Sequence, residues 1–578
     1  MGYFDQVNRE LLARVDVTAA TIVELGCGTG ALGAVLRLRA PMARVIGVEL
    51  DPAAAKAARS ALNAVVEGDI EMPETLAALD TALAGAPIDH LVIGDVLEHL
   101  RDPWAVLSAL RARMRPGGGA TICLPNAAHW SLIRGQLAGD WTYRDAGLLD
   151  RTHLRFFTRA TAKAMFDKAG FAVESVLPRL ARSDRGPRAR ASLAALAEAG
   201  AALGLDPDRV RDEIRPMQWL FTLRAGQPRP ARRVFAIGIR GAALSLSTIR
   251  LLQPIEALSG HRPVASRCSL GEFVLPGPGG QPGIIVTYRL HPAKDSEVWQ
   301  RLDVLADAGW LILHDLDDHP AFLKAQRAND FRSIRTAHAV TVTAPALFDV
   351  VRPMNPHVHL LPNQVFDLPA PRDRILAGRT GPLRVLFAAI NREADWQAQC
   401  GALEAALAAG TLAVDLSAIH APRLSERLGK SVRSMPFLDY PDYRREMLAA
   451  DAALCPLTET EFNACKSDLK IVECLAHGTI PIVSAEAAAQ TDVPRDLMLV
   501  ADRPRDWARH LRTLSADDGK LAAMKRAGLD WVIRHRMWHG HVAALDALHD
   551  RLFADLARLE TDRRARIAAC GMSGTGAQ

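Results

Sequence analysis

The feature that most constrains the fold of this chain is residues 22–30, where an apolar run ends in a turn that contains Gly26, Gly28 and Gly30. An Ala- and Leu-rich helix is expected directly afterwards, over residues 31–38. Glycine allows tight bends and close backbone approaches that a Cβ would prevent, and the helix start offers unpaired N–H groups. A strand, a glycine turn and a helix in this order predict the ligand-binding edge of a Rossmann-like α/β sheet.

Two acidic residues narrow the choice of ligand. The next expected strand, 44–48, is followed by Glu49, which stands 19 positions after Gly30 and can accept both hydroxyl groups of a ribose. Glu24 stands just before the glycine turn, where a negative charge would repel a phosphate group. We therefore predict that this edge binds a cationic ligand rather than a dinucleotide.

Residues 24–30 resemble motif I, E-x-G-x-G-x-G, of the class I S-adenosylmethionine-dependent methyltransferases. The resemblance continues through residues 47–51, 67–69, 94–100 and 115–119. It implies that S-adenosylmethionine is the cofactor and that these residues bind it: Glu24, Gly26, Gly28, Gly30, Glu49, Asp69 and Asp95. By the same resemblance Glu49 holds the ribose, Asp69 holds the adenine amino group, and residues 95–99 form the floor beside the methyl donor.

Methyl transfer to oxygen or nitrogen is an in-line displacement that often requires the removal of a proton. His99 follows the fourth expected strand, at the carboxyl edge of the sheet where ligands bind. Because free histidine titrates near neutrality, we predict that His99 is the catalytic base. The alternative is that His99 begins a helix and packs locally.

Two further segments, 125–130 and 149–157, resemble the acceptor side of methyltransferases from cell-surface sugar pathways. The resemblance implies that His129, Asp150 and His153 contact the methyl acceptor. For Asp150 and His153 there is an alternative, in which they cap the helix expected to begin near Thr158.

The end of the first domain is predicted from two strand patterns. Residues 171–176 form a strand after a helix stop, and residues 217–224 alternate like an edge strand, where the final antiparallel strand of a methyltransferase sheet would lie. We therefore predict a class I methyltransferase domain over 1–225 and a proline-stiffened linker over 226–233.

Composition excludes several classes of protein. The 578 residues carry a formal net charge of +5, which is small for this length and argues against nucleic-acid binding. Apolar runs are interrupted before the length of a membrane span, and the start of the chain lacks an apolar signal core. The eight cysteines form no C-x-x-C pair, so they are expected to be reduced. These features predict a cytoplasmic protein without a transmembrane span, and they leave room for peripheral membrane contact.

From residue 234 strands and helices alternate again, which predicts two more α/β sheets. We expect a first lobe over 234–368 and a second lobe over 369–559. In the first lobe, Asp315, Asp317 and Asp318 form a D-x-D pattern that could hold a divalent metal against a sugar nucleotide. We favour the interpretation of Asp317 and Asp318 as lobe-edge or acceptor-cleft residues, with no metal.

Residues 462–478 resemble the donor site of two-lobed (GT-B) retaining enzymes of glycosyltransferase family 4, in the variant F-N-x-x-K-S-x-L-K-x-x-E. Residues 391–396 also resemble that group. The resemblance implies a nucleotide-sugar co-substrate that is bound without metal by these residues: Asn391, Arg392, Lys466, Lys470 and Glu473.

Lys466 and Lys470 are four residues apart, so on one helix they would share a face and neutralise the departing nucleoside diphosphate. Glu473 would hold the donor ribose, and its alternative is an exposed Lys–Glu helix pair. The sequence departs from the commoner E-x7-E pattern, because Cys465 stands where the first glutamate would be. The residues that could replace that carboxylate are Glu459, Glu461 and Asp468.

The last part of the chain, 505–559, has a helical pattern that predicts bracing helices anchored by Trp507, Leu511, Trp531 and Trp538. Residues 560–578 become polar and then Gly-rich, and we predict a disordered tail in which Cys570 is an exposed thiol.

The sequence therefore predicts an α/β chain in which a Rossmann-like class I methyltransferase domain is followed by a GT-B pair of Rossmann-like lobes. The expected function is bifunctional: methylation of a glycan or glycolipid acceptor and glycosyl transfer from a nucleotide-sugar, in bacterial cell-surface polysaccharide or glycoconjugate synthesis. Two alternatives stay open. In one, the chain is only a methyltransferase whose C-terminal lobes bind glycan or nucleotide-sugar without catalysis. In the other, the N-terminal domain binds S-adenosylmethionine as a regulator.

Overall fold

The computed structural model describes residues 7–238, 244–271, 274–277, 281–289, 291–388 and 392–571. The chain divides into two compact units. Unit 1 comprises Met1–Ala231 and Ser259–Val264, and unit 2 comprises Arg232–Leu258 and Ala265–Gln578. Each unit is described by itself.

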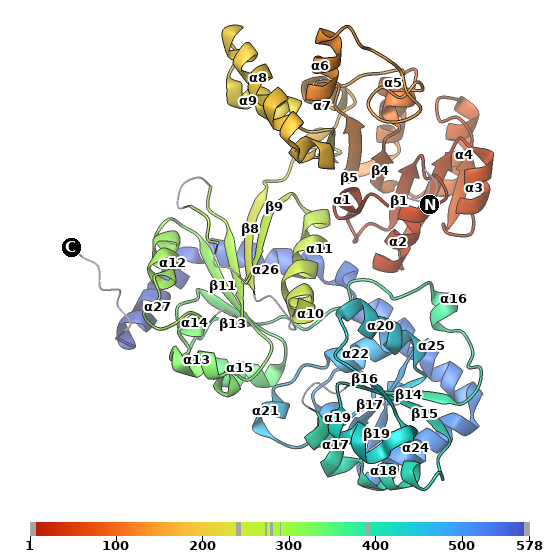
Figure 1. Ribbon diagram of the computed structural model, residues 1–578, viewed down its shortest axis with the longest axis vertical. Helices are drawn as coiled ribbons and strands as arrows, with labels where there is room; N and C mark the ends of the chain where they lie inside the picture. The colour runs from red at the N-terminus through yellow and green to blue at the C-terminus, as the bar shows by residue number, and fades with distance from the viewer. Residues whose placement is uncertain are drawn as a thin grey trace. The chain divides into compact units, whose positions relative to one another are not determined.

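In the described part of unit 1, one seven-stranded sheet runs in the order β3-β2-β1-β4-β5-β7-β6. Figure 1 labels the neighbouring strands β1, β4 and β5 of this sheet. Its strands are β1 (Thr21–Leu25), β2 (Arg44–Glu49), β3 (Ala64–Glu67), β4 (Ile88–Gly94), β5 (Met114–Pro125), β6 (Ala172–Arg179) and β7 (Gln218–Arg224). Strands β1 to β5 are parallel, and β7 runs antiparallel to both of its neighbours. All residues of β1 are buried, as expected for a parallel strand that is covered on both faces.

The helices of unit 1 are α1 (Arg9–Leu12), α2 (Ala31–Arg39), α3 (Pro52–Ala58), α4 (Pro73–Leu83), α5 (Pro103–Ala112), α6 (Trp130–Leu137), α7 (Arg159–Lys168), α8 (Pro187–Ala202) and α9 (Pro207–Ile214). Helices α3 and α5 each begin with an aspartate cap, Asp51 and Asp102, followed by proline at the first helical position. These caps fix where the chain leaves each strand and therefore shape the carboxyl edge of the sheet.

Two details of unit 1 differ from the sequence-based expectation. The strand at 217–224 was expected at the sheet edge, but β7 lies between β5 and β6, and β6 forms the edge. Helix α7 is capped by Thr158, whose hydroxyl oxygen accepts from Thr161 N, while the Thr161 side chain accepts from Thr158 N. The alternative in which Asp150 and His153 cap this helix is therefore wrong.

The first sheet of unit 2 has the order β13-β12-β11-β10-β8-β9 over the residues that are described. Its strands are β8 (Arg232–Gly238), β9 (Val264–Leu270), β10 (Ile284–Tyr288), β11 (Leu311–Leu316), β12 (Ala339–Val342) and β13 (Val358–Leu360). The helical segments along this part of the chain are α10 (Leu244–Ser247), a π-helical turn (Thr248–Leu252), α11 (Gln253–His261), α12 (Val298–Asp307), α13 (Lys324–Ala328), α14 (Arg332–Arg335) and α15 (Pro345–Val351). Strand β8 begins at Arg232, inside the segment expected to be a linker.

The second sheet of unit 2 has the order β16-β15-β14-β17-β18-β19 and is parallel in every described pair. Its strands are β14 (Leu383–Ala388), β15 (Val414–Ile419), β16 (Arg433–Met435), β17 (Ala452–Cys455), β18 (Ile480–Ser484) and β19 (Leu499–Ala501). This order reverses beside β14, so it places a topological switch point between β14 and β17, where doubly wound sheets bind ligands.

The helices that follow or cover this sheet are α16 (Arg372–Ile375), α17 (Glu393–Gln399), α18 (Gly401–Ala408), α19 (Pro422–Leu428), α20 (Tyr440–Ala449), α21 (Glu461–Ala464), α22 (Leu469–Ala476), α23 (Ala485–Ala489), α24 (Pro504–Ala516) and α25 (Asp518–His535). Trp507 and Leu511 of α24 are buried in the core of this sheet. They anchor α24 as the helical pattern predicted.

The last described helices pack on the other sheet of unit 2. Leu548 and Leu552 of α26 (Val542–Ala554) and Leu559 of α27 (Leu556–Ala569) are buried against residues of β10, β11 and β12. The prediction of disorder from residue 560 is wrong for 560–569, because Arg563 of α27 is buried and pairs with Asp303 of α12 at 2.7 Å. Residues 572–578 of the expected tail lie outside the described residues.

The predicted Rossmann-like α/β architecture is confirmed for the N-terminal region, and the parallel sheets of unit 2 are compatible with the predicted lobes. Among the helices of the described ranges, none combines the length and the apolar character needed to cross a lipid bilayer.

Candidate active site

The glycine turn after β1 has the geometry that its sequence predicts. Gly26, Gly28 and Gly30 have φ angles of 69°, 54° and 82°, in the left-handed region that favours glycine. A Cβ at position 26 would lie 2.4 Å from Cγ2 of Val96, so a larger residue would collide. Gly30 is also the N-cap of α2, and the turn therefore leads directly into a helix start.

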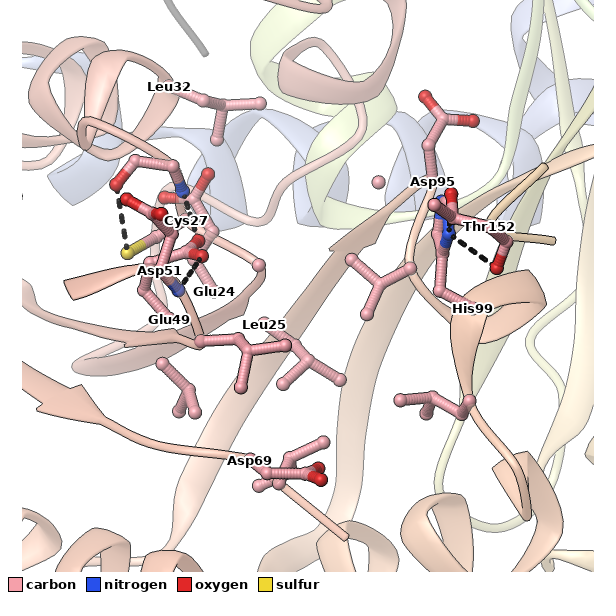
Figure 2. A pocket seen from close by; sticks show the side chains of 18 of the residues that line it. Glu24, Leu25, Cys27, Leu32, Glu49, Asp51, Asp69, Asp95, His99 and Thr152 are labelled. Carbon is pink, nitrogen blue, oxygen red and sulfur yellow. Dashed lines mark hydrogen bonds between the residues drawn. The ribbon is translucent and has the colours of Figure 1, made fainter. Parts of the chain in front are cut away.

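A cavity of about 1040 Å³ opens beside this turn. Its walls come from the carboxyl ends of β1, β2 and β4 and from the segments that follow them (Figure 2). In Figure 2, Glu24, Cys27 and Glu49 lie together on one side of the view, and Asp95, His99 and Thr152 lie together on the other. The predicted cofactor residues that line the cavity are Glu24, Gly26, Gly28, Glu49, Asp69 and Asp95. Gly30, which shapes the turn, is not among the lining residues.

Glu49 fastens the glycine turn to the end of β2. Its Oε2 accepts a hydrogen bond from Gly28 N at 2.7 Å, and its Oε1 accepts from Asp51 N at 2.9 Å. Each carboxylate oxygen has a second lone pair, so both can still accept a hydroxyl group from a ligand in the cavity. The predicted ribose contact therefore fits the geometry.

Glu24 is buried beneath the turn. Burial raises its pKa to about 8, with the charge of Glu49 adding to the effect and a hydrogen bond from the Gly33 backbone opposing it. A carboxyl group with this pKa is mostly neutral at pH 7, so the prediction that Glu24 repels phosphate through its charge does not hold for the ligand-free protein. A cation in the cavity would favour the ionised form.

Asp69 lies at the rim of the cavity. Its Oδ1 accepts from Glu71 N at 2.9 Å, and its Oδ2 pairs with the exposed side chain of Arg101 at 3.2 Å. Such an exposed pair is weak, since it contributes only about 0–1 kcal/mol. An adenine amino group could replace Arg101 as the donor to Asp69 at little cost.

A second cavity of about 390 Å³ adjoins the first, and Asp95, Asp150 and Arg179 line both. Asp95 has a left-handed φ of 54°, and its Oδ1 accepts from Nε2 of Gln218 at 2.5 Å. Burial raises the pKa of Asp95 to about 6, although Arg179 opposes the shift. The two cavities can hold a cofactor and an acceptor that meet at Asp95.

His99 ends a short 3-10 helix, Leu97–His99, that follows β4. Its Nδ1 contacts the hydroxyl of Thr152 at 3.0 Å, and that hydroxyl lies 2.7 Å from Oδ1 of Asp150. Burial would raise the pKa of Asp150, but hydrogen bonds from Thr152 outweigh it, so the carboxyl has a lowered pKa and is ionised. The hydroxyl proton therefore goes to Asp150, and Nδ1–H of His99 donates to Thr152. Nε2 of His99 is left with a lone pair.

His153 joins this group from the segment that leads to α7. Its ring lies 4.8 Å from the ring of His99, edge to face, and its Nδ1 is 3.3 Å from the carbonyl oxygen of Leu148. Burial and the neighbouring His99 lower the pKa of His153. Asp150 and His153 both line the second cavity, and their contact with a methyl acceptor stays a prediction.

The structure does not bring His129 to either cavity. His129 is the buried N-cap of α6, where its Nδ1 is 2.7 Å from Oγ of Ser131 and its Nε2 donates to Oδ1 of Asp184 at 3.0 Å. Both ring nitrogens are therefore used inside the fold. The prediction that His129 contacts the acceptor is corrected: this side chain positions α6.

Arg179 and Gln218, which line the second cavity, were not predicted from the sequence, and Glu98 was predicted only as part of the floor formed by residues 95–99. Gln218 connects Asp95 to Arg179, whose guanidinium donates to Oε1 of Gln218. Glu98 is buried beside Asp95, and burial followed by the charge of Asp95 raises its pKa well above the ordinary value. Because Gln218 reaches the site from the last strand of the domain, only the antiparallel pairing of β7 with β5 could have indicated it.

In unit 2, Lys470 of α22 reaches the switch point of the second sheet. Its Nζ donates to the carbonyl oxygen of Ala388, the last residue of β14, and burial lowers its pKa. Glu473 of the same helix is buried and accepts from the hydroxyls of Tyr440 and Tyr443 at 2.8 and 3.1 Å. Glu473 is therefore not part of an exposed Lys–Glu pair.

Lys466 was predicted to share a helix face with Lys470, but it lies outside the helix that carries Lys470. The chain turns between α21 and α22, and α22 begins only after its N-cap Asp468. Nζ of Lys466 lies 4.2 Å from the ring centre of Phe462 and pairs with Asp318 of the first sheet's region. The two ammonium groups thus belong to different segments and have different partners.

The D-x-D carboxylates all have cationic partners within unit 2. Asp315 pairs with Arg250 at 2.6 Å, and Asp317 and Asp318 both contact Arg289. Arg392 donates to Oδ1 of Asn463 at 2.6 Å. Asn391, which was predicted to bind the nucleotide-sugar, lies outside the described residues.

Cys465 and two of the residues that could replace the missing first glutamate of E-x7-E have packing or ion-pair contacts within unit 2. Cys465 is buried in the core of the first sheet's region. Asp468 pairs with Arg536 at 2.6 Å, and the exposed Glu461 pairs with His319 at 3.2 Å. Glu459, the third residue that could replace the missing glutamate, is exposed.

Comparison with known proteins finds similarity to methyltransferases in the first part of the chain. The family described as "Methyltransferase domain" matches residues 3–176. The trans-aconitate 2-methyltransferase of Azoarcus sp. (strain BH72) is 35% identical over 145 residues, which are 24% of this chain and 53% of that protein. The ubiquinone biosynthesis O-methyltransferase of Xylella fastidiosa (strain M23) is 27% identical over 165 residues, which are 28% of this chain and 65% of that protein. The chain thus spans only part of the length of these curated relatives.

Among solved structures, a SAM dependent methyltransferase from Archaeoglobus fulgidus is similar with a TM-score of 0.26 and 17% sequence identity. The similarity covers 37% of this chain and 90% of that one.

Proposed function

We propose that unit 1, in which residues 3–176 match the methyltransferase family, is a class I S-adenosylmethionine-dependent methyltransferase domain that transfers a methyl group to a glycan or other sugar-containing acceptor. The observation that carries this proposal is the pair of adjoining cavities. The larger is lined by the motif residues that suit S-adenosylmethionine, and the smaller shares Asp95, Asp150 and Arg179 with it. A cofactor in the first cavity and an acceptor in the second would meet at these shared residues.

The donor set of the larger cavity suits a cationic nucleoside. Glu49 offers oxygen lone pairs to ribose hydroxyls, Asp69 offers an acceptor for an amino group, and Glu24 ionises most easily when a cation is present. S-adenosylmethionine supplies the methyl group when it is bound. The protein's own contribution is to hold the acceptor in line with that group and to exclude other orientations. Most of the rate enhancement of such a displacement arises from this positioning.

His99 can act on the acceptor as a base. Since its Nδ1–H donates to Thr152, Nε2 keeps the lone pair that would receive a proton from an acceptor hydroxyl or amine. His99 lines the larger cavity and His153 lines the smaller one. The names of both curated relatives describe methyltransferases, and one is an O-methyltransferase, which favours oxygen as the atom that is methylated.

Calorimetry and product analysis test this function. We expect the full-length protein to bind S-adenosylmethionine and to form S-adenosylhomocysteine when a panel of oligosaccharide acceptors is added. Asp95→Asn should lower the rate by at least about tenfold, and Asp167→Asn, at an exposed carboxylate of α7 outside both cavities, serves as the matched control. Binding without product on any acceptor would instead favour the regulatory alternative.

We infer a second function, glycosyl transfer from a nucleotide-sugar, for unit 2. The supporting observation is the position of Lys470, whose ammonium group stands at the carboxyl end of β14, beside the switch point of a doubly wound sheet. A cation there would stabilise the diphosphate that leaves in the transition state. Glu473 of α22 accepts from the hydroxyls of Tyr440 and Tyr443 of α20, and we infer that its carboxylate would also accept from a ribose hydroxyl.

The alternative for unit 2 is a binding module without catalysis, and two measurements separate the two. First, thermal shift with a panel of nucleotide-sugars identifies the ligand, because a ligand at about 100 times its dissociation constant adds about 2.7 kcal/mol of stability. Second, release of the nucleoside diphosphate reports turnover. Lys470→Met should abolish both effects, and Lys520→Met, at an exposed position of α25, should preserve them. A thermal shift without release would favour the binding module.

A further inference from the structure

Glu98, His99 and His153 form a cluster at the boundary of the two cavities in unit 1. One ligand atom of each side chain, a carboxylate oxygen or a ring nitrogen, lies within 4.8 Å of the others. His99 lines the larger cavity, and Glu98 and His153 line the smaller one. The cluster therefore stands where a methyl donor and an acceptor would meet.

The side chain of Glu98 requires an explanation. It is 1% exposed, and neither of its carboxylate oxygens has a hydrogen-bond partner among the described residues. A buried polar group without a partner costs free energy, and a buried carboxylate costs more than a neutral group. Such groups are rare in folded proteins and are commonly explained by an ion or another partner that the group receives.

The backbone holds this carboxylate in place against the segment that carries His153. The carbonyl oxygen of Glu98 accepts from Leu154 N at 2.8 Å and from Arg155 N at 3.0 Å. Two hydrogen bonds between the 3-10 helix and this segment fix the distance between the side chains of Glu98 and His153. The cluster is thus built by the fold rather than by chance contact of surface side chains.

Both histidines are oriented in the manner of metal ligands. Nδ1 of His99 lies 3.3 Å from the carbonyl oxygen of Thr152 and 3.0 Å from its hydroxyl, and Nδ1 of His153 lies 3.3 Å from the carbonyl oxygen of Leu148. A ring whose Nδ1–H points to an oxygen keeps the lone pair on Nε2, and metal-binding histidines almost always have such a second partner. Thr152 and Leu148 therefore hold both rings in a ligating tautomer.

We propose that Glu98, His99 and His153 bind one divalent cation of the first transition row. Two imidazole nitrogens and one carboxylate oxygen favour ions such as Mn²⁺, Co²⁺ or Zn²⁺ over Mg²⁺ and Ca²⁺, which prefer oxygen ligands. Three protein ligands leave coordination positions open, which is the arrangement of catalytic rather than structural sites. No metal site was predicted from the sequence.

The cation would act on the acceptor, and this role rests on the methyl transfer proposed above. An acceptor hydroxyl in the smaller cavity would bind an open position and lose its proton more easily, with the proton passing to water. The resulting oxygen would attack the methyl carbon, so that a C–O bond forms as the S–C bond breaks. The bonding electron pair stays on sulfur, and S-adenosylhomocysteine leaves. In this scheme His99 is a ligand and not the base.

Cobalt titration tests the site directly. Untagged, full-length protein is treated with a chelator, and Co²⁺ is added while visible absorption and calorimetry are recorded. We expect one Co²⁺ per chain with d–d bands typical of nitrogen and oxygen ligands. Glu98→Gln and His153→Gln should each weaken binding by at least about tenfold. His535→Gln, at an exposed histidine of α25, is the matched control and should leave the affinity unchanged.

Cofactor binding separates this proposal from the proposed function. If S-adenosylhomocysteine binds to both variants and to wild type alike, the variants are folded and their loss of Co²⁺ affinity is specific. Absence of Co²⁺ binding in wild type, or affinity unchanged in both variants, would overturn the metal site and leave the methyltransferase proposal standing. Co²⁺ binding without any binding of S-adenosylmethionine would instead overturn the methyltransferase proposal and leave the metal site standing.

Discussion

Replacing Glu24 by glutamine removes a proton that the ligand-free protein holds at neutral pH. Because burial raises the pKa of Glu24 to about 8, its carboxyl group is about nine-tenths protonated at pH 7. A cationic ligand stabilises the ionised form and lowers this pKa. Binding of S-adenosylmethionine should therefore release the proton, and glutamine at this position has none to release.

The size of the effect follows from linkage. If the bound cation keeps Glu24 ionised, wild type releases about 0.9 proton at pH 7 in excess of the variant. The sign is fixed by the direction of the shift: ionised Glu24 binds the cation better, so affinity rises with pH. Between pH 6 and pH 8 the wild-type dissociation constant should fall by up to about 50-fold more than that of Glu24→Gln.

Calorimetry in two buffers that differ in their heat of protonation measures this number of protons. The amino group of S-adenosylmethionine also titrates near this range, and the comparison with Glu24→Gln cancels its contribution because both proteins receive the same ligand. Equal proton release by wild type and variant, together with parallel pH profiles of affinity, would refute the assignment of a raised pKa to Glu24.

Two further predictions concern the same unit. Gly26→Val should abolish detectable S-adenosylmethionine binding in calorimetry. A Cβ at this position would lie 2.4 Å from Val96, and the φ angle of 69° disfavours a branched residue. Wild-type affinity in this variant would argue against the glycine turn as the binding edge. His129→Ala should lower the free energy of unfolding by about 1–3 kcal/mol, because buried Asp184 loses a hydrogen-bond donor. The dissociation constant for S-adenosylmethionine should stay within about twofold of wild type. A large loss of affinity would instead indicate that His129 contributes to the binding site.

The part of the site that could be predicted from sequence is the part that one continuous segment determines. Gly26 and Gly28 need left-handed backbone, and Glu49 follows the adjacent parallel strand, so their meeting at one edge follows from local rules. Lys470 reached the expected sheet edge for the same reason, since its helix and strand β14 belong to one doubly wound sheet.

The remaining features depend on contacts between distant segments. Gln218 enters the site from a strand that pairs antiparallel, and the unpartnered oxygens of Glu98 depend on burial that no local pattern reveals. His129 was assigned to the acceptor by its motif, but the fold turns it to Asp184. The prediction that Lys466 and Lys470 share a helix face was wrong because the N-cap Asp468 begins a new helix between them.

The most direct test of the account is the structure of the full-length protein bound to S-adenosylhomocysteine. We predict that the ribose hydroxyls lie within about 3.2 Å of the Glu49 carboxylate, that the adenine amino group lies near Asp69, and that the sulfur faces Asp95 and the second cavity. A ligand bound elsewhere on the chain, or oriented with its sulfur away from Asp95, would contradict the proposed methyl transfer.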